Sequence, residues 1–256
     1  MAFLTLNFKS KALAGNTTVN IYLPETVTED MPVLYLLHGM GGDQNAWNTG
    51  SSIGKFVRYG SFAVVMPYGA NSFYSNMRYG PRYFDYVSEE LPEYICSLFT
   101  FISRKREKTF VGGLSMGGYG AVKIALRNPA RFSAAASISG PMDIIEDVKF
   151  PGWSDITTAN WGENYAEDLK GSEDDLLHLV DTFPADAPKP RIYAVCGTED
   201  FLYPQNQTFR KHMEGKGFDF VYEEAPGVHN WDFFGGWLKP ALLHLFAPLM
   251  EAEKKQ

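Results

Sequence analysis

Short apolar runs separated by stretches of helical periodicity constrain the fold of this chain more than any other feature of its sequence. The runs span residues 33–37, 62–66, 110–111, 134–138 and 192–195. Apolar runs without alternation indicate strands that are covered on both faces, as the strands of parallel sheets are. Strands that alternate with helices form right-handed βαβ units. The pattern therefore predicts an α/β fold with a mostly parallel central sheet and helices on both faces.

Helices are expected between these runs. Residues 51–59 carry apolar side chains at helical spacing and stop at a glycine, which is a common C-terminal signal. A longer helix over residues 84–98 contains Pro92, which must kink it or restart it. The next helix covers about residues 118–127 and ends before Pro129, because proline disfavours the helical conformation in the preceding residue.

Two parts of the chain depart from this rhythm. Residues 2–9 and 17–23 alternate apolar and polar side chains and are joined by Gly15-Asn16, which predicts an antiparallel pair at one edge of the sheet. Residues 141–190 contain tryptophans, clustered acids and a proline-rich end. We expect this segment to form a small cap insertion over the sheet.

Composition favours one globular unit. The chain has 256 residues, of which 45% are hydrophobic and 21% charged, so it can bury a large apolar core. We expect a single domain over residues 1–256 whose charged tail, residues 251–256, frays. The net charge of -7 argues against nucleic acid or an anionic membrane as a partner, because both require a concentrated basic surface. The sequence leaves open whether the chain forms a homo-oligomer.

The sequence also favours the cytoplasm. It has no run of about 18 apolar residues that could span a membrane, and its first residues alternate like a strand instead of forming a secretory signal. Cys96 and Cys196 lie in apolar contexts without a CxxC spacing. We interpret both as buried free thiols.

Gly113, Ser115 and Gly117 fill a G-x-S-x-G pattern between an expected strand and an expected helix. The pattern alone is weak evidence in a chain with 24 glycines, but the strand and the helix provide the setting of a nucleophile elbow. The sharp turn holds the serine hydroxyl out from the sheet, and the flanking glycines let strand and helix approach each other. The alternative is a glycine-rich turn with an idle serine.

A serine hydroxyl becomes an effective nucleophile only when a histidine accepts its proton. In this setting the chain order is serine, acid, histidine, and each partner lies just past a strand. His229 fits, because it follows a strand-like segment at residues 218–223 and a turn. His38 precedes Ser115 and is better placed to support a loop. The remaining histidines lie in helical stretches, at His178, His212 and His244.

The acid should follow the preceding strand, which leads into Glu199 and Asp200. Asp200 is the first choice and Glu199 its close rival, although either could simply be a turn residue, because acids are common at such positions. Asp232 lies three residues beyond His229 and is better explained as a residue at the start of a helix.

Acyl transfer also needs backbone amides that receive the negative charge of the attacked carbonyl oxygen. One should come from Met116, directly after the serine, and the second from the loop after the run at residues 33–37. Met40 is favoured for the second amide, with Gly41 as the alternative. The glycines fit no nucleotide-binding pattern and no metal motif occurs, so we expect neither a cofactor nor a metal.

Aromatic residues that flank these loops are candidates for the wall of a confined acyl pocket. Trp153, Phe201 and Trp231 are the main candidates. Aromatic residues at junctions between loops and regular elements are equally common in cores, so each has a purely structural alternative.

Four blocks of the sequence together resemble the esterase D family, and within it the tributyrin esterase branch. They are LLHGMGG at residues 36–42, YFDYV at 83–87 with ELP at 90–92, GLSMGG at 113–118 and CGTEDFL at 196–202. The resemblance spans nearly the whole chain and implies an α/β-hydrolase fold with a small cap, no cofactor and hydrolysis of short acyl esters. It also implies that Ser115, Asp200 and His229 form a catalytic triad, with Met40 and Met116 as oxyanion amides.

The sequence thus favours a serine carboxylesterase that acts on a small acyl ester through an acyl-enzyme. A carbohydrate esterase of the acetylxylan or feruloyl type is one alternative. An S-formylglutathione hydrolase-like thioesterase is another, although such enzymes carry a loop of Ser-Gly-Leu-Thr-Cys type where this chain has HGMGG at residues 38–42. A non-catalytic binding relative is less favoured, because such relatives usually lack a triad residue and none is lost here. An acyltransferase that hands the acyl group to another alcohol is also less favoured, although the triad alone does not exclude it.

Overall fold

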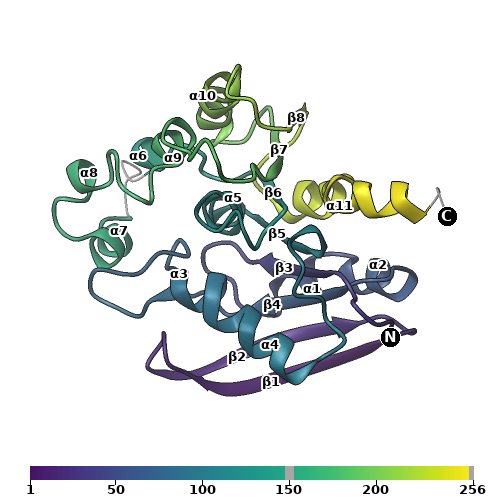
Figure 1. The fold of residues 1–256 in the computed structure, drawn as a ribbon. Helices are drawn as coiled ribbons and strands as arrows, with labels where there is room; N and C mark the ends of the chain where they lie inside the picture. Colours follow the sequence, from purple (N-terminus) through teal and green to yellow (C-terminus); the bar gives the residue numbers. More distant parts are fainter. Residues whose placement is uncertain (148–152, 254–256) are drawn as a thin grey trace.

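A computed structural model describes residues 1–147 and 153–253, which form an eight-stranded sheet with helices on both faces (Figure 1). The strand order is β1-β2-β4-β3-β5-β6-β7-β8, and all neighbours from β4 to β8 run parallel. β1 and β2 pair antiparallel, and β2 is antiparallel to β4. The strand bounds are β1 Ala2–Ser10, β2 Gly15–Leu23, β3 Val33–Leu37, β4 Ala63–Pro67, β5 Thr109–Leu114, β6 Ala134–Ile138, β7 Arg191–Gly197 and β8 Phe220–Ala225.

The helices divide between the two faces of the sheet, and each face has its own apolar core. Helices α3, α4, α5, α9 and α10 contribute to one core, and α1, α2 and α11 contribute to the other. This is the α/β-hydrolase fold that the resemblance implied. The helix bounds are α1 Ala46–Gly50, α2 Ile53–Tyr59, α3 Tyr83–Asp85, α4 Leu91–Leu98, α5 Met116–Arg127, α6 Ile144–Asp147, α7 Ser154–Trp161, α8 Tyr165–Asp168, α9 Leu176–Asp181, α10 Tyr203–Met213 and α11 Trp231–Glu253.

Strand β3 shows why an uninterrupted apolar run becomes a central strand. Val33, Tyr35 and Leu37 face the core that includes α5, whereas Leu34 and Leu36 face the core that includes α11. Successive side chains of a strand point to opposite faces, so a strand with helices on both sides needs apolar residues throughout. The bounds predicted for this strand and for β6 are those observed.

The turn of the N-terminal hairpin differs from the prediction. Gly15 and Asn16 lie inside β2, and the chain reverses over residues 11–14. The carboxylate of Glu90 accepts hydrogen bonds from two backbone amides of this turn, at 2.7 and 3.0 Å. A carboxylate distant in sequence thus contacts the turn, and this contact gives no signal in the local sequence.

Two helix boundaries also refine the prediction. A π-helical turn, Tyr86–Glu90, joins α3 to α4 in one continuous helical stretch over residues 83–98, and Pro92 follows directly after this irregular turn. At the other end of the chain, α11 continues to Glu253, and the fraying expected for residues 251–256 stays a prediction. Residues 254–256 lie outside the described part.

The segment between β6 and β7 contains the short helices α6 to α9, which lie to the left of α5 in Figure 1, on the opposite side from α11. The cap insertion expected at residues 141–190 falls in this segment, and its residues 148–152 lie outside the described part. Contacts between α5 and α9 join the insertion to the rest of the molecule.

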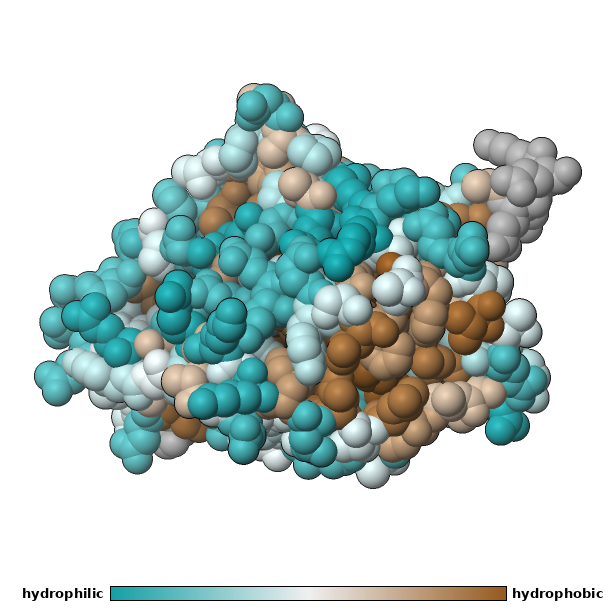
Figure 2. All heavy atoms as spheres, turned by 60° about the horizontal axis from the view of Figure 1, so that its bottom comes forward, coloured by the Kyte–Doolittle hydropathy of each residue, from teal (hydrophilic) through white to brown (hydrophobic). Residues whose placement is uncertain are grey.

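Apolar side chains also gather on the surface. Figure 2 turns the lower side of Figure 1 forward and shows apolar residues concentrated toward the right of this face, while the remainder is mostly hydrophilic. A cleft of about 320 Å³ lies between α2 and α11, lined mainly by apolar side chains that include Phe56, Tyr59, Leu243 and Phe246.

Candidate active site

Ser115 occupies the sharp turn between β5 and α5. Its backbone has a φ of 51° and a ψ of -126°, outside the regions that non-glycine residues prefer. The Ser115 amide donates to the carbonyl oxygen of Ile138 on the neighbouring strand (2.9 Å), which ties the turn to the sheet. A Cβ atom on Gly113 would lie 2.5 Å from the backbone of Gly117, so strand and helix can meet only without that side chain. The turn therefore has the geometry of a nucleophile elbow.

The structure brings Ser115, His229 and Asp200 together from the ends of different strands. His229 Nε2 lies 2.9 Å from Ser115 Oγ, and His229 Nδ1 lies 2.8 Å from Asp200 Oδ2. A carboxylate can only accept, so Nδ1 carries the proton and Nε2 is left to accept the hydroxyl proton of Ser115. This is the arrangement in which a serine can be deprotonated and the resulting imidazolium stabilised.

Asp200 is held rigidly in this position. The residue is only 4% exposed, and its Oδ1 accepts a hydrogen bond from the Leu202 amide (2.9 Å). Glu199, the rival acid, is exposed and turns instead to the Gly227 amide, which donates to its Oε2 at 2.6 Å. The two neighbouring acids thus contact different parts of the loop that carries His229.

His38 supports a loop, as expected from its position. Its Nδ1 donates to the carbonyl oxygen of Gly39 (2.7 Å), and its Nε2 accepts from the Gly69 amide (2.8 Å). Burial lowers the pKa of the imidazole, which agrees with a neutral ring that donates at one nitrogen and accepts at the other. His178, His212 and His244 lie on α9, α10 and α11, as predicted.

The amides expected to receive the oxyanion differ in their hydrogen bonds. The Gly41 amide donates to Asn71 Oδ1 at 2.7 Å and is therefore engaged. By contrast, the amides of Met40 and Met116 donate no hydrogen bond to any other described residue. This difference favours Met40 over Gly41. Asn71 belongs to no motif, so nothing in the sequence indicated its contact with this loop.

A cleft of about 490 Å³ opens over Ser115 and His229. The loop at residues 39–43 forms one side, and Trp231 and Phe234 form another. Of the aromatic residues proposed as pocket walls, Trp231 lines this cleft, and the Phe201 ring lies 4.7 Å from the His229 ring. Trp153 lies elsewhere, with its ring 6.1 Å from that of Phe73.

Within residues 1–147 and 153–253, no cluster of histidine, cysteine, aspartate or glutamate residues could hold a metal ion. None of the helices in these residues has the length and apolar character needed to cross a membrane. Cys96 and Cys196 are both buried free thiols, which confirms the interpretation of the sequence.

Comparison with known proteins places this geometry in a family. Residues 10–245 match the family model Esterase, described as "Putative esterase". The acetyl esterase of Caldicellulosiruptor saccharolyticus is 35% identical over 260 residues, which cover 94% of this chain and 97% of that protein.

Solved structures agree with the sequence matches. The fluorophosphonate-binding serine hydrolase FphF of Staphylococcus aureus superposes with a TM-score of 0.88 at 30% identity, covering 95% of this chain and 98% of that chain. The S-formylglutathione hydrolase FrmB of the same organism gives a TM-score of 0.86 at 29% identity, with the same coverage. The chain belongs to the Esterase family and is a serine carboxylesterase of the α/β-hydrolase fold.

Proposed function

We propose that the protein hydrolyses short-chain acyl esters through a Ser115–His229–Asp200 triad. The observation that carries this proposal is the imidazole of His229, which lies 2.9 Å from the Ser115 hydroxyl and 2.8 Å from the Asp200 carboxylate. The similarity to an acetyl esterase supports a small acyl group. Within the wider family, we assign the chain to esterase D and its tributyrin esterase branch on the four sequence blocks.

In the proposed reaction, Ser115 Oγ attacks the acyl carbon while His229 takes the hydroxyl proton. The carbonyl oxygen becomes negatively charged and accepts hydrogen bonds from the Met40 and Met116 amides. His229 then gives its proton to the leaving alcohol, and an acyl-enzyme remains. Water attacks that ester in the same way and releases the acid and the free serine. We further propose that residues 141–190 act as a cap over this site. The cytoplasmic location stays a prediction from the sequence.

Replacing the nucleophile tests the proposal directly. Ser115→Ala should lower kcat for p-nitrophenyl acetate and butyrate by about a million-fold, since loss of the serine of such a triad has an effect of that size. Labelling of the protein by a fluorophosphonate should disappear in the same variant. A Ser115→Ala protein that keeps a tenth of the wild-type rate would disprove the assignment. A series of p-nitrophenyl esters from acetate to dodecanoate, on wild type, tests the preference for short acyl groups.

The neighbouring acids provide a matched pair of variants. Asp200→Asn should lower kcat by about ten-thousand-fold, because an amide cannot hold the correct tautomer of His229. Glu199→Gln should cost far less, since Glu199 contacts the Gly227 amide and not the imidazole. Equal losses in the two variants would contradict the choice of Asp200 as the acid.

A thioesterase activity is the second candidate, and the similarity to S-formylglutathione hydrolase FrmB supports it. The loop HGMGG at residues 38–42 argues against a thioesterase, because it differs from the Ser-Gly-Leu-Thr-Cys type of loop that such enzymes carry. Comparing kcat/KM for S-formylglutathione with that for p-nitrophenyl acetate separates the two. An oxygen esterase should prefer the acetate ester by a wide margin, and the reverse preference would establish the thioesterase.

A further inference from the structure

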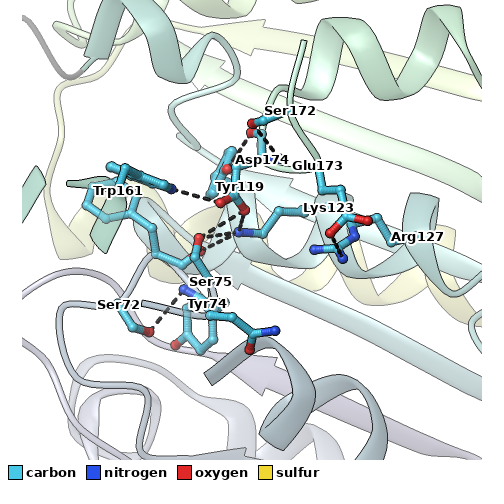
Figure 3. Close-up of polar contacts among 12 residues, drawn as sticks. Ser72, Tyr74, Ser75, Tyr119, Lys123, Arg127, Trp161, Ser172, Glu173 and Asp174 are labelled. Atoms are coloured by element: carbon cyan, nitrogen blue, oxygen red, sulfur yellow. Dashed lines mark hydrogen bonds and ion pairs between the residues drawn. The ribbon is translucent and has the colours of Figure 1, made fainter. Parts of the chain in front are cut away.

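Lys123 on α5 is fully buried, and its ammonium group is surrounded by acceptors. Nζ donates to Asp174 Oδ1 at 2.5 Å, to Ser75 Oγ at 2.6 Å and to the carbonyl oxygen of Phe73 at 3.0 Å (Figure 3). Each of the three N–H bonds of the ammonium thus has a partner. Burial lowers the pKa of the group to about 8, which reflects the cost of taking this charge out of water. Because burying an ion pair is costly, such a pair is a poor way to gain stability alone.

Asp174 connects this charge to the insertion between β6 and β7. Its Oδ2 accepts from Trp161 Nε1 at 2.8 Å, and its Oδ1 accepts from Ser75 Oγ at 3.0 Å. Its backbone carbonyl accepts from the Tyr119 hydroxyl on α5 at 2.5 Å. We call Lys123, Asp174 and Ser75 the buried cluster. It joins α5, the insertion and the loop at residues 69–75.

The loop at residues 69–75 has a strained backbone that needs external support. Ala70, Phe73 and Tyr74 have positive φ values of 46°, 49° and 52°. Non-glycine residues in this region are strained and persist only where the surroundings hold them. Lys123 donates to the carbonyl of Phe73, directly between two of the strained residues.

The same loop forms hydrogen bonds with the segment that carries the Met40 amide. The Tyr74 hydroxyl donates to the carbonyl oxygen of His38 at 2.9 Å, and the Gly69 amide donates to the His38 ring at 2.8 Å. Asn71 Oδ1 accepts from the Gly41 amide at 2.7 Å. These contacts fix the backbone on both sides of Met40, and with it the direction of the Met40 N–H.

We propose that the buried cluster is a positioning device for the oxyanion hole, which holds the loop at residues 69–75 and thereby orients the Met40 amide. The inference rests on the proposed role of that amide in hydrolysis. Amides that receive an oxyanion are effective because they are oriented before the charge develops. Loosening the cluster should therefore weaken transition-state binding and leave the binding of the ester nearly unchanged.

The decisive variant removes both charges together. Lys123→Met with Asp174→Asn leaves no unpaired buried charge, and neutral replacement of a buried pair often preserves stability. A second double variant, Arg127→Met with Glu173→Gln, serves as the matched control. Arg127 and Glu173 form an ion pair between the same helix and the same insertion, without a contact to the loop at residues 69–75 (Figure 3).

Three readouts separate positioning from mere stabilisation. Fluorophosphonate titration counts the molecules with a reactive Ser115, so kcat refers to active sites alone. The Ki of a trifluoromethyl ketone reports on the oxyanion hole, because Ser115 Oγ bonds to the ketone carbon, the carbonyl π electrons move to oxygen, and His229 takes the proton. Thermal unfolding gives the stability of each variant.

We expect the cluster variant to lose about ten- to a hundredfold in kcat, less than the roughly hundred- to thousandfold loss when a donor is removed outright. KM should stay within about threefold, and the ketone Ki should rise by the same factor as kcat falls. The control variant should match wild type in kcat and Ki. Wild-type kcat and Ki in a stable cluster variant would overturn the inference, as would a fall in kcat without a rise in Ki.

Milder variants cover the case in which the double substitution does not fold. Ser75→Ala leaves the ion pair in place and should raise the ketone Ki several-fold, and an unchanged Ki would overturn the inference. Asn71→Ala should raise it as well, and Asn71→Asp should restore it, because a carboxylate still accepts from the Gly41 amide. Failure of the proposed function itself has a different signature, namely fluorophosphonate labelling and hydrolysis that persist in Ser115→Ala.

Discussion

At the scale of single residues, Gly117 is a position where even one methyl group has no space. A Cβ atom there would lie 2.4 Å from the carbonyl oxygen of Leu37 and 2.6 Å from that of His38. Both are backbone atoms of the segment that leads into Met40, so they cannot move without shifting the loop that carries that amide. The turn at Ser115 and the loop at residues 39–43 are therefore matched to each other by the absence of a side chain.

Gly117→Ala should lower the free energy of unfolding by about 1–3 kcal/mol, the usual cost of overpacking, and should lower kcat as well. Urea unfolding and hydrolysis of p-nitrophenyl acetate measure the two effects. Gly236→Ala is the matched control, because a Cβ on that exposed helical glycine meets nothing within 4 Å. The control should be neutral or slightly stabilising. If both variants unfold at the same urea concentration as wild type, the structure can accommodate a methyl group at position 117, and this explanation is wrong.

The residues of the site differ in how far the sequence could identify them. Ser115, Asp200 and His229 were chosen from chain order and from the strands that precede them, and the structure brings these side chains into contact. Asn71 and Lys123 gave no such signal. Their contacts join segments far apart in the chain, and a single polar residue in a loop or helix has many ordinary explanations.

At the scale of elements, Asp30 links the start of β3 to the connection before β5. Its carboxylate accepts from Ser103 Oγ at 2.6 Å, from Lys105 Nζ at 2.7 Å and from Lys108 Nζ at 2.9 Å. The hydrogen bond of Lys105, followed by those of Ser103 and Lys108, lowers the pKa of this carboxyl group. The link holds two neighbouring parallel strands at the ends where they begin.

Asp30→Asn should lower the free energy of unfolding at pH 7 by about 1 kcal/mol, the scale of partly exposed ion pairs. The folded pKa of Asp30 lies below the unfolded value of about 3.9, so its stabilisation is complete above about pH 4 and is lost as pH falls further. Thermal unfolding of wild type and variant should therefore converge toward pH 2. Glu25→Gln is the control, because Glu25 is exposed and lies 3.6 Å from Arg58. A constant difference between pH 7 and pH 2 would contradict this account.

Elements were predictable where local pattern and tertiary environment agree. β3 and β6 are buried on both faces, so their apolar runs gave the bounds directly. The prediction for the N-terminal turn was wrong, and the turn observed at residues 11–14 is bound by Glu90, a residue distant in sequence that the local pattern does not include. Likewise, β5 extends beyond the predicted residues 110–111 to Thr109–Leu114, since Gly112 and Gly113 are strand residues that a hydrophobic pattern does not detect.

At the scale of the whole molecule, the strands of the sheet differ in how far they are buried from solvent. β5 and β6 are central and every residue in them is buried, whereas β1 lies at the edge and exposes one side along most of its length. Opening β1 uncovers only one side of the sheet edge, where its side chains are partly buried, but opening β5 disrupts both cores. Local opening should therefore start at the edge.

Hydrogen–deuterium exchange followed by mass spectrometry measures this gradient. Peptides from β5 and β6 should exchange about a hundredfold or more slowly than those from β1 at neutral pH, because only near-global unfolding exposes the central amides. Peptides from α5 provide an internal comparison, since all residues of this helix except Arg127 are buried. Equal exchange in β1 and β5 would mean that the sheet opens as one unit.

The two buried cysteines can serve as chemical probes of local unfolding. Cys196 lies in β7, the strand that ends near Asp200, and Cys96 lies in α4, where it is 6% exposed. Burial shields both thiols and raises their pKa, so an alkylating reagent should modify them much faster once the chain around them separates. In a sample of inactivated enzyme, slow alkylation of Cys196 would thus mean that only the catalytic loops are disordered. Fast alkylation would mean that β7, the strand behind those loops, has also separated from the sheet.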